Sequence, residues 1–264
     1  MAKGSFFDLP MGASFGDYSI YKRKDSDKWI VRAKGGATKE RFASDPRMAS
    51  CRKNANTFSG NATTGKTIRY AMMDVAQLGH SKLTGDINSV VSKIRKLTPS
   101  TTPGQDQIIL SNGLHLLQGF NLNKVNVFDS VVSTPLQWSI DRITYKATLQ
   151  LPKLSPGMNL KNPWNLPYFR FIMNLGIIRD MYFDGAKYKT MTPSIPDHTI
   201  LDKTQWAPVN MAYPAQSFTF QFDNPVFDEH CYLMLSVGIE FGKQVEGGIG
   251  AVTDASCGKI VDVV

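Results

Sequence analysis

The strongest constraint on the fold is a run of alternating apolar residues near the C-terminal end of the chain. Its apolar positions are Cys231, Leu233, Leu235, Val237, Ile239 and Phe241. Successive side chains of a β-strand point to opposite faces, so this alternation predicts a strand with one face in a core. A strand of this kind needs a sheet around it and a second layer over that sheet.

Other segments after Gly119 share this period of two. The segment 218–222 alternates phenylalanine with polar residues, and the segment 138–151 alternates in two phases that meet between Ile140 and Ile143, which predicts a β-bulge. A cluster of valines with Phe128, at 125–132, predicts a further buried strand. Proline-rich connections at 160–167 and 192–196 separate these segments. The pattern predicts an antiparallel immunoglobulin-like β-sandwich from about 120 to 243.

The first hundred residues follow a different pattern. Residues 17–33 predict a charged hairpin, and residues 38–58 are weakly helical with an interruption at Pro46. Two apolar stripes with helical spacing follow: Ile68, Met72 and Val75, and then Ile87, Val90, Val91, Ile94 and Leu97. For the second helix we expect Thr84 or Asp86 as the cap and Pro99 just past the end.

These patterns divide the chain into three parts. We expect a basic N-terminal arm with hairpin and helices over 1–110, the β-sandwich over 111–243 and a Gly-rich C-terminal tail over 244–264. The fold class is therefore mainly β with an α-helical N-terminal part.

The positive charge of the chain is concentrated in its N-terminal third. The 264 residues carry 30 Lys+Arg and 22 Asp+Glu, a net charge of +8. Residues 1–96 hold 18 Lys+Arg and 8 Asp+Glu, a charge of +10, while residues 97–264 hold 12 and 14, a charge of −2. Such an asymmetry indicates a nucleic acid, a membrane surface or an acidic partner subunit.

The candidate partner-binding residues lie in this basic third, with Tyr18 and Tyr21 interleaved. They are Lys22, Arg23, Lys24, Lys28, Trp29, Arg32, Lys34, Lys39, Arg41, Arg47, Arg52 and Lys53. Phosphate contacts combined with stacking on the aromatic rings would suit a nucleic acid. Contact with the acidic sandwich of a neighbouring copy explains the same residues.

One segment matches the phosphate-binding pattern G-x-x-x-x-G-K-[ST]. It runs from Gly60 to Gly65, Lys66 and Thr67. In a P-loop this segment follows a buried strand of an α/β sheet, whereas residues 46–59 contain no such strand. We therefore interpret it as a Gly-containing joint between two helical segments.

The sequence shows no catalytic residues, metal site or cofactor site. The densest group of metal-ligating residues is 228–231, which includes His230 and Cys231. Because this group starts a strand, alternation sends neighbouring side chains to opposite faces, and one metal is not expected to collect them. We expect no enzyme activity.

Composition and cysteine usage narrow the class further. Hydrophobic residues make up 42% of the chain and charged residues 20%, which excludes a wholly disordered protein. Cys51, Cys231 and Cys257 are an odd number without a C-x-x-C pair, as expected of reduced thiols in a cytoplasm, and Cys231 fits a small core residue. The N-terminal residues lack the apolar core of a signal peptide, and no apolar stretch is long enough to span a membrane.

Several segments resemble a group of uncharacterised proteins from Bacteroidota. They are 29–36, Arg52, Asn54, 58–60, 65–66, 119–123 and 127–130. The resemblance covers about the first half of the chain and implies no activity, because none is assigned to the group. It also implies a helical, non-nucleotide context for Gly60 and Lys66.

The sequence therefore predicts a non-enzymatic structural subunit. We expect copies to self-assemble into a homo-oligomeric filament, tube or phage-like particle through the basic arm and the β-sandwich body. The alternative is a nucleic-acid-binding protein that uses the basic third, and a further alternative is a P-loop NTPase.

Overall fold

The computed structural model describes residues 14–22, 28–33, 35–98, 102, 104–192, 199–223 and 228–264. The chain divides into two compact units, Met1–Arg52 and Lys53–Val264, with the boundary inside helix α2 (Ala49–Gln77). The protein is mainly β, with 39% strand against 28% helix, and its sheets are antiparallel. The expected fold class is confirmed at this level.

Unit 1 contains a small three-stranded sheet and two short helices. The sheet has the order β1 (Ser14–Phe15), β2 (Tyr18–Lys22) and β3 (Trp29–Ala33), so the predicted hairpin is present. Helix α1 (Lys39–Ser44) is followed by the 3-10 helix η2 (Pro46–Met48). Pro46 starts η2, where the amide hydrogen that proline lacks would have no helical partner.

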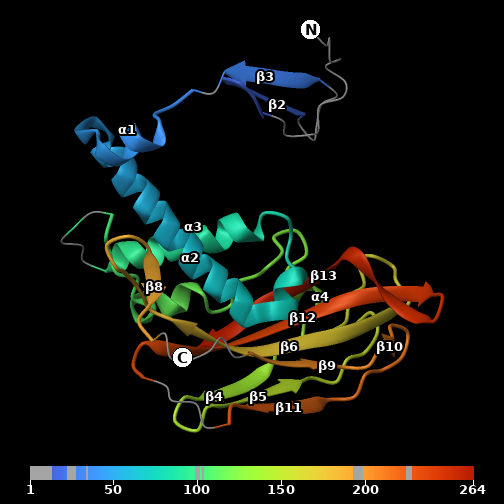
Figure 1. Cartoon of the computed structure of the whole chain (residues 1–264). Helices are drawn as coiled ribbons and strands as arrows, with labels where there is room; N and C mark the ends of the chain where they lie inside the picture. The colour runs from blue at the N-terminus through green and yellow to red at the C-terminus, as the bar shows by residue number, and fades with distance from the viewer. Residues whose placement is uncertain are drawn as a thin grey trace. The chain divides into compact units, whose positions relative to one another are not determined.

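The first sheet of unit 2 has five strands. Its order is β10 (Ala207–Pro208), β6 (Tyr168–Arg179), β12 (Cys231–Val245) and β13 (Gly248–Val263), and β9 (Thr199–Lys203) also pairs with β6. A second sheet has the order β11 (Gln216–Gln221), β5 (Lys146–Leu151) and β4 (Gln137–Asp141). Strands β7 (Met181–Phe183) and β8 (Tyr188–Thr190) form a separate two-stranded ribbon. Figure 1 shows these strands in unit 2.

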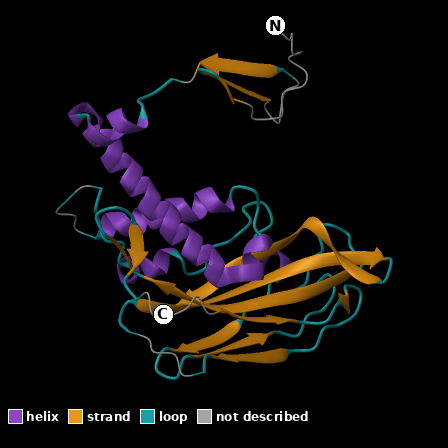
Figure 2. Cartoon of the chain, viewed as in Figure 1, coloured by secondary structure: helices purple, strands orange, loops and turns teal. Residues whose placement is uncertain are grey.

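Unit 2 has three layers because the five-stranded sheet is buried on both faces. One face meets the three-stranded sheet, in a core that includes Phe171, Leu149 and Ile239. The other face meets α2, α3 (Leu83–Leu97) and η3 (Leu110–Leu116), in a core that includes Met72 and Ile94. Figure 2 shows the helices on one side of the long strands and the short strands on the other. The helices after Arg52 therefore belong to the body, whereas we expected them in an arm ending at residue 110.

The segment 244–264 is not a tail. It holds the end of β12 and the whole of β13, which pairs with β12 along most of its length. Gly258 suits a strand under a helix, because an added Cβ would lie 3.0 Å from the Val237 carbonyl oxygen of β12 and 3.3 Å from Val75 Cγ1 of α2. Close helix packing, rather than flexibility, explains this glycine.

The segment 125–132 is not a buried strand. It is a loop followed by the short helix α4 (Phe128–Val131), and the Val125 side chain is 87% exposed. Two asparagine side chains accept the backbone hydrogen bonds that a neighbouring strand would otherwise accept. Asn121 Oδ1 accepts from the Phe128 amide, and Asn123 Oδ1 accepts from the Val125 and Asn126 amides. Such local side-chain bonds compete with a sheet ladder.

The change of phase near Ile140 is a hairpin turn, not a β-bulge. Strand β4 ends at Asp141 and β5 begins at Lys146. The Asp141 carboxylate accepts from the amides of Ile143 and Thr144 and from the Thr144 hydroxyl, which closes the turn and lowers the pKa of Asp141. The two apolar phases therefore belong to two different strands.

The helices differ from expectation at their starts. Helix α2 is continuous from residue 49 to 77 apart from a kink at Met73 (φ 41°, ψ −114°). Helix α3 begins at Leu83, after Lys82 and without a side-chain cap, so neither Thr84 nor Asp86 is the cap. Its end at Leu97 agrees with the expected end, while Pro99 lies outside the described residues. Among the helices described, none has the length and apolar character needed to cross a membrane.

Candidate functional site

The structure divides the predicted basic residues among several elements. Lys22 ends β2, Lys28 precedes β3, and Trp29 and Arg32 lie on β3. The others described are Lys39 and Arg41 on α1, Arg47 on η2, and Arg52 and Lys53 on α2. Arg23, Lys24 and Lys34 lie outside the described residues. Unit 1 carries 11 Lys+Arg and 6 Asp+Glu, a charge of +5, and unit 2 carries 19 and 16, a charge of +3.

Three of these arginines gather around Asp45. The Arg41 Nε lies 3.2 Å from Asp45 Oδ2, and the Arg47 Nε lies 3.5 Å from Oδ1. Arg52 donates to the carbonyls of Phe42 at 2.7 Å and Asp45 at 3.0 Å. These contacts link α1, η2 and the start of α2, while most of the Arg41 and Arg47 side chains stays exposed.

The hairpin residues form a different group, with aromatic side chains beside cations. The pairing register sets Lys22 opposite Trp29, Ile20 opposite Val31 and Tyr18 opposite Ala33, which places these pairs on one face of the sheet. The opposite face carries Tyr21, Ile30, Ser19 and Arg32. This small sheet is the candidate interaction surface of unit 1.

The segment that matches a P-loop pattern lies within the continuous helix α2. Its backbone amides are therefore engaged in helical bonds and cannot cradle a phosphate. Gly60 and Gly65 face the interior, where an added Cβ would lie 2.6 Å from the Tyr188 ring and 2.1 Å from Asn88 Oδ1. Lys66 is exposed, with its Nζ 5.1 Å from the centre of the Tyr70 ring. The glycines serve packing, and the interpretation as a joint between two helices is wrong.

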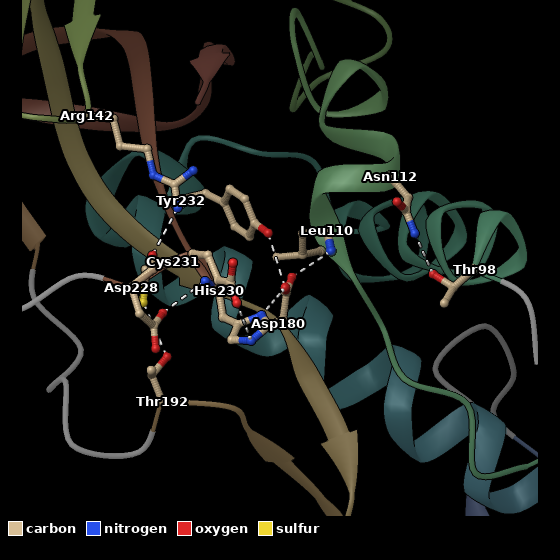
Figure 3. Close-up of polar contacts among 11 residues, drawn as sticks. Thr98, Leu110, Asn112, Arg142, Asp180, Thr192, Asp228, His230, Cys231 and Tyr232 are labelled. Atoms are coloured by element: carbon tan, nitrogen blue, oxygen red, sulfur yellow. Dashed lines mark hydrogen bonds and ion pairs between the residues drawn. The ribbon is translucent and has the colours of Figure 1, made fainter.

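Asp180 is the centre of a buried polar cluster that the sequence did not reveal. Its Oδ1 accepts from the Leu110 amide at 2.7 Å, and its Oδ2 lies 3.0 Å from His230 Nδ1 and accepts from the Tyr232 hydroxyl at 3.1 Å (Figure 3). Burial raises the pKa of Asp180 by more than these hydrogen-bond donors lower it. The hydrogen bond to Asp180 raises the pKa of His230. The cluster joins the end of β6 to the starts of η3 and β12.

A histidine held by a buried carboxylate resembles part of a general-base dyad. The nearby thiol does not complete it, because Cys231 Sγ bonds to Thr192 Oγ1 at 3.2 Å and the Cys231 side chain belongs to the core between the two sheets. Burial raises the pKa of Cys231 and so disfavours the thiolate. We therefore assign the Asp180 cluster a structural role.

Residues 228–231 do not converge on one point. The Asp228 carboxylate accepts from the His230 amide, while the His230 ring turns to Asp180 and Cys231 turns to Thr192. Glu229 is exposed, with one carboxylate oxygen 3.9 Å from His230 Nε2. Within the part of the chain that the structure describes, no group of three or more His, Cys, Asp or Glu side chains is placed to hold a metal.

A polar cleft lies on the helix side of the five-stranded sheet. Its volume is about 690 Å³, and its lining includes Asp74 and Gln77 of α2, Arg170 of β6, Lys203 of β9 and Glu240 of β12. Arg170 and Glu240 are cross-strand partners, with Nε and Oε1 2.5 Å apart, and Asp74 pairs with Lys203. The sequence carries only a weak signal for this cleft, namely charged residues within otherwise apolar strands.

Comparison of the chain with protein-family models, with curated proteins and with solved structures finds no match.

Proposed function

We propose that the protein is a non-enzymatic structural subunit that assembles with copies of itself through unit 1. The observation that carries the proposal is the small sheet of β1, β2 and β3. On β2 and β3 the only buried side chain is Ile20. Tyr18, Trp29 and Val31, on the same face as Ile20, are 52%, 45% and 51% exposed.

A sheet of this size needs a cover. Three strands become stable when they share an apolar face that is packed against something else. Exposed apolar groups gathered on one surface usually mark an interface. Unit 2, in contrast, has a core on each face of its main sheet, built from its own residues. We therefore propose that an assembly partner covers the exposed apolar face of this sheet.

We propose the sandwich of a neighbouring copy as that partner. Residues 97–264, which hold both sheets of the sandwich, carry 12 Lys+Arg against 14 Asp+Glu, a charge of −2, so the +3 of unit 2 comes from its helical residues 53–96. Unit 1 has a charge of +5. Opposite charges favour contact between unit 1 of one copy and the sandwich of the next, and they oppose contact between two copies of unit 1. A contact between unlike surfaces repeats from copy to copy, which produces rings or filaments.

The test is a pair of substitutions on the exposed face, Trp29→Ser and Val31→Ser. We expect the double variant to shift assemblies toward the monomer in size-exclusion chromatography with light scattering. Phe58→Ser is the matched control, because Phe58 is 69% exposed but lies on α2 in unit 2. Assemblies that survive the double variant and dissociate in the control would refute this role of unit 1.

One observation favours a second function, binding of single-stranded nucleic acid. The exposed rings of Tyr18 and Trp29 share a face with Lys22, and bases stack on rings beside cations in such proteins. Fluorescence anisotropy with a labelled oligonucleotide tests it. Binding that weakens steeply with salt would support this function. Absence of binding in low salt would remove it.

We also propose that the two packed sheets form an immunoglobulin-like sandwich. The support for this proposal is the division of the strands between the two sheets, leaving out the separate ribbon of β7 and β8. One sheet contains β4, β5 and β11. The other contains β6, β12 and β13, with β9 and β10 at its edge. Immunoglobulin domains divide strands A, B and E from strands C, F and G in this order. An experimental structure with a different strand order would refute it.

A further inference from the structure

The polar cleft of unit 2 is a candidate ligand site that the assembly proposal does not use. Helix α2 ends at Gln77, so it covers only part of the five-stranded sheet. The cleft lies where that cover ends, and it is lined from α2, β6, β9, β12 and β13 and from the loops near His80 and Asn123. Its volume of about 690 Å³ is within the range of small-molecule sites.

Two strained backbone positions flank this cleft. Met73, next to Asp74, has φ 41° and ψ −114°, and Asp254 has φ 63°. Asp254 lies in an irregular part of β13, where pairing passes from Ala251 with Gly242 to Ser256 with Glu240. Strained residues persist where the surroundings hold them, and they gather at ligand sites. The kink in α2 and the bulge in β13 thus shape two walls of one cleft.

Four of the charged side chains inside the cleft are already paired. Arg170 bonds to Glu240, and its guanidinium lies 4.5 Å from the centre of the Trp206 ring. Lys203 pairs with Asp74 on the opposite wall. An ionic ligand would have to displace one of these partners, which leaves a poorly solvated charge behind. The exposed carboxylate of Asp254 also repels an anion, and Arg170 and Lys203 in the same lining repel a cation, so the charge pattern favours an uncharged ligand.

Neutral hydrogen-bonding groups remain available in the same lining. The side-chain amides of Gln77 and Asn126 and the hydroxyls of Ser81 and Thr253 have no hydrogen-bond partner among the residues that the structure describes. Each amide offers both donors and an acceptor, and each hydroxyl offers both functions. Val125 and Val252 add an apolar surface that solvent reaches. A sugar ring, with neighbouring hydroxyl groups and an apolar face, is complementary to these amides, hydroxyls and apolar side chains.

We infer that the cleft binds a neutral polyhydroxylated ligand, a short saccharide without acidic groups. Ligand hydroxyls would bond to the Gln77 and Asn126 amides and bridge the Arg170–Glu240 pair without separating it. A ring face would lie against Val125. This inference is independent of the assembly proposal, because every residue that it uses belongs to unit 2.

Isothermal titration calorimetry of the full chain tests the inference with maltotriose, cellotriose, mannotriose and N-acetylated chitotriose as neutral probes, and with trigalacturonic acid as the acidic probe. We expect at least one neutral probe to bind with a Kd below about 1 mM. Gln77→Met with Asn126→Leu should weaken that binding by about tenfold or more, since two hydrogen bonds are lost.

Asn54→Leu is the matched control, because Asn54 lies on an exposed position of α2 outside the lining. Thermal unfolding of each variant shows whether the fold is retained. The inference is overturned if no neutral probe binds, if only the acidic probe binds, or if the folded double variant binds as tightly as the control.

Discussion

Gly176 of β6 lies directly against the backbone of Ala71 in helix α2. A Cβ on Gly176 would be 2.0 Å from the Ala71 carbonyl oxygen and 2.7 Å from its Cα. The helix therefore rests on the sheet at a point where only a hydrogen fits between the two backbones. This contact sets how closely α2 approaches the sheet.

Gly176→Ala should therefore destabilise unit 2. The obstructing atoms are backbone atoms of a helix, which cannot rotate away as a side chain can. We expect a loss of about 2–4 kcal/mol in the free energy of unfolding, measured by urea denaturation. Gly85→Ala is the control, because Gly85 lies in α3 with nothing within 4 Å of an added Cβ. Alanine there should increase the free energy of unfolding by at most about 1 kcal/mol. Equal effects of the two substitutions would contradict the packing described.

The pairing of His230 with Asp180 predicts a pH dependence of stability. Because the folded pKa of His230 is raised, its contribution is fully present below the unfolded pKa of about 6.5 and is lost as pH rises through the folded pKa. The His230 side chain is 36% exposed, so solvent screening limits the contribution to about 0.5 kcal/mol.

Unfolding of the protein and of His230→Gln should be compared from pH 6 to pH 8. The difference in stability between the two should shrink as pH rises. A difference that grows with pH would show that the histidine is not held as a cation by Asp180.

The three thiols should differ sharply in reactivity. Cys51 is exposed, whereas Cys231 and Cys257 are buried, and burial raises the pKa of Cys257 to about 12. Titration of the native protein with a chromogenic disulfide reagent should therefore modify Cys51 alone. Cys51→Ser should abolish the native reaction, and modification of all thiols should require denaturant. Rapid native labelling in Cys51→Ser would contradict the burial of the other two.

Lys66→Ala should leave nucleotide interactions unchanged. Lys66 is on the exposed side of α2, while Gly60 and Gly65 face the interior, so the three residues do not share a binding loop. Equilibrium dialysis with radiolabelled ATP, before and after the substitution, should show the same result. A loss of ATP binding specific to Lys66→Ala would revive the P-loop interpretation.

Elements with one buried face could be predicted from the sequence. Strand β11 and the helix α3 each expose one side, so apolar and polar residues alternate with the period of the element. Strand β12 is buried on both faces, but its sequence still alternates over 231–241. The alternation is visible because serine, glycine and glutamate occupy several of the positions that face the helices. The predicted hairpin of unit 1 was also found.

Elements that are apolar on both faces, or rich in glycine, could not be predicted in this way. Strand β6 is buried over most of its length on both sides, so its sequence is nearly continuous in apolar residues and shows no period. Strand β13 contains Gly248, Gly250 and Gly258 and therefore resembled a tail, although α2 and β12 both approach Gly258 closely.

The candidate sites depend on contacts between residues far apart in the sequence. Arg170 and Glu240 meet through strand pairing, and Asp180 meets Leu110 and His230 through three different elements. A single sequence carries no local signal for such contacts. The basic residues were visible, but their division between the Asp45 group and the hairpin was not.

Sedimentation velocity of the full chain in low salt, over a wide range of concentration, tests whether the protein assembles with copies of itself. Self-assembly through unit 1 predicts species larger than the 29.3 kDa monomer, which increase with concentration and form ordered assemblies in electron micrographs. A single 29.3 kDa species at every concentration would contradict it.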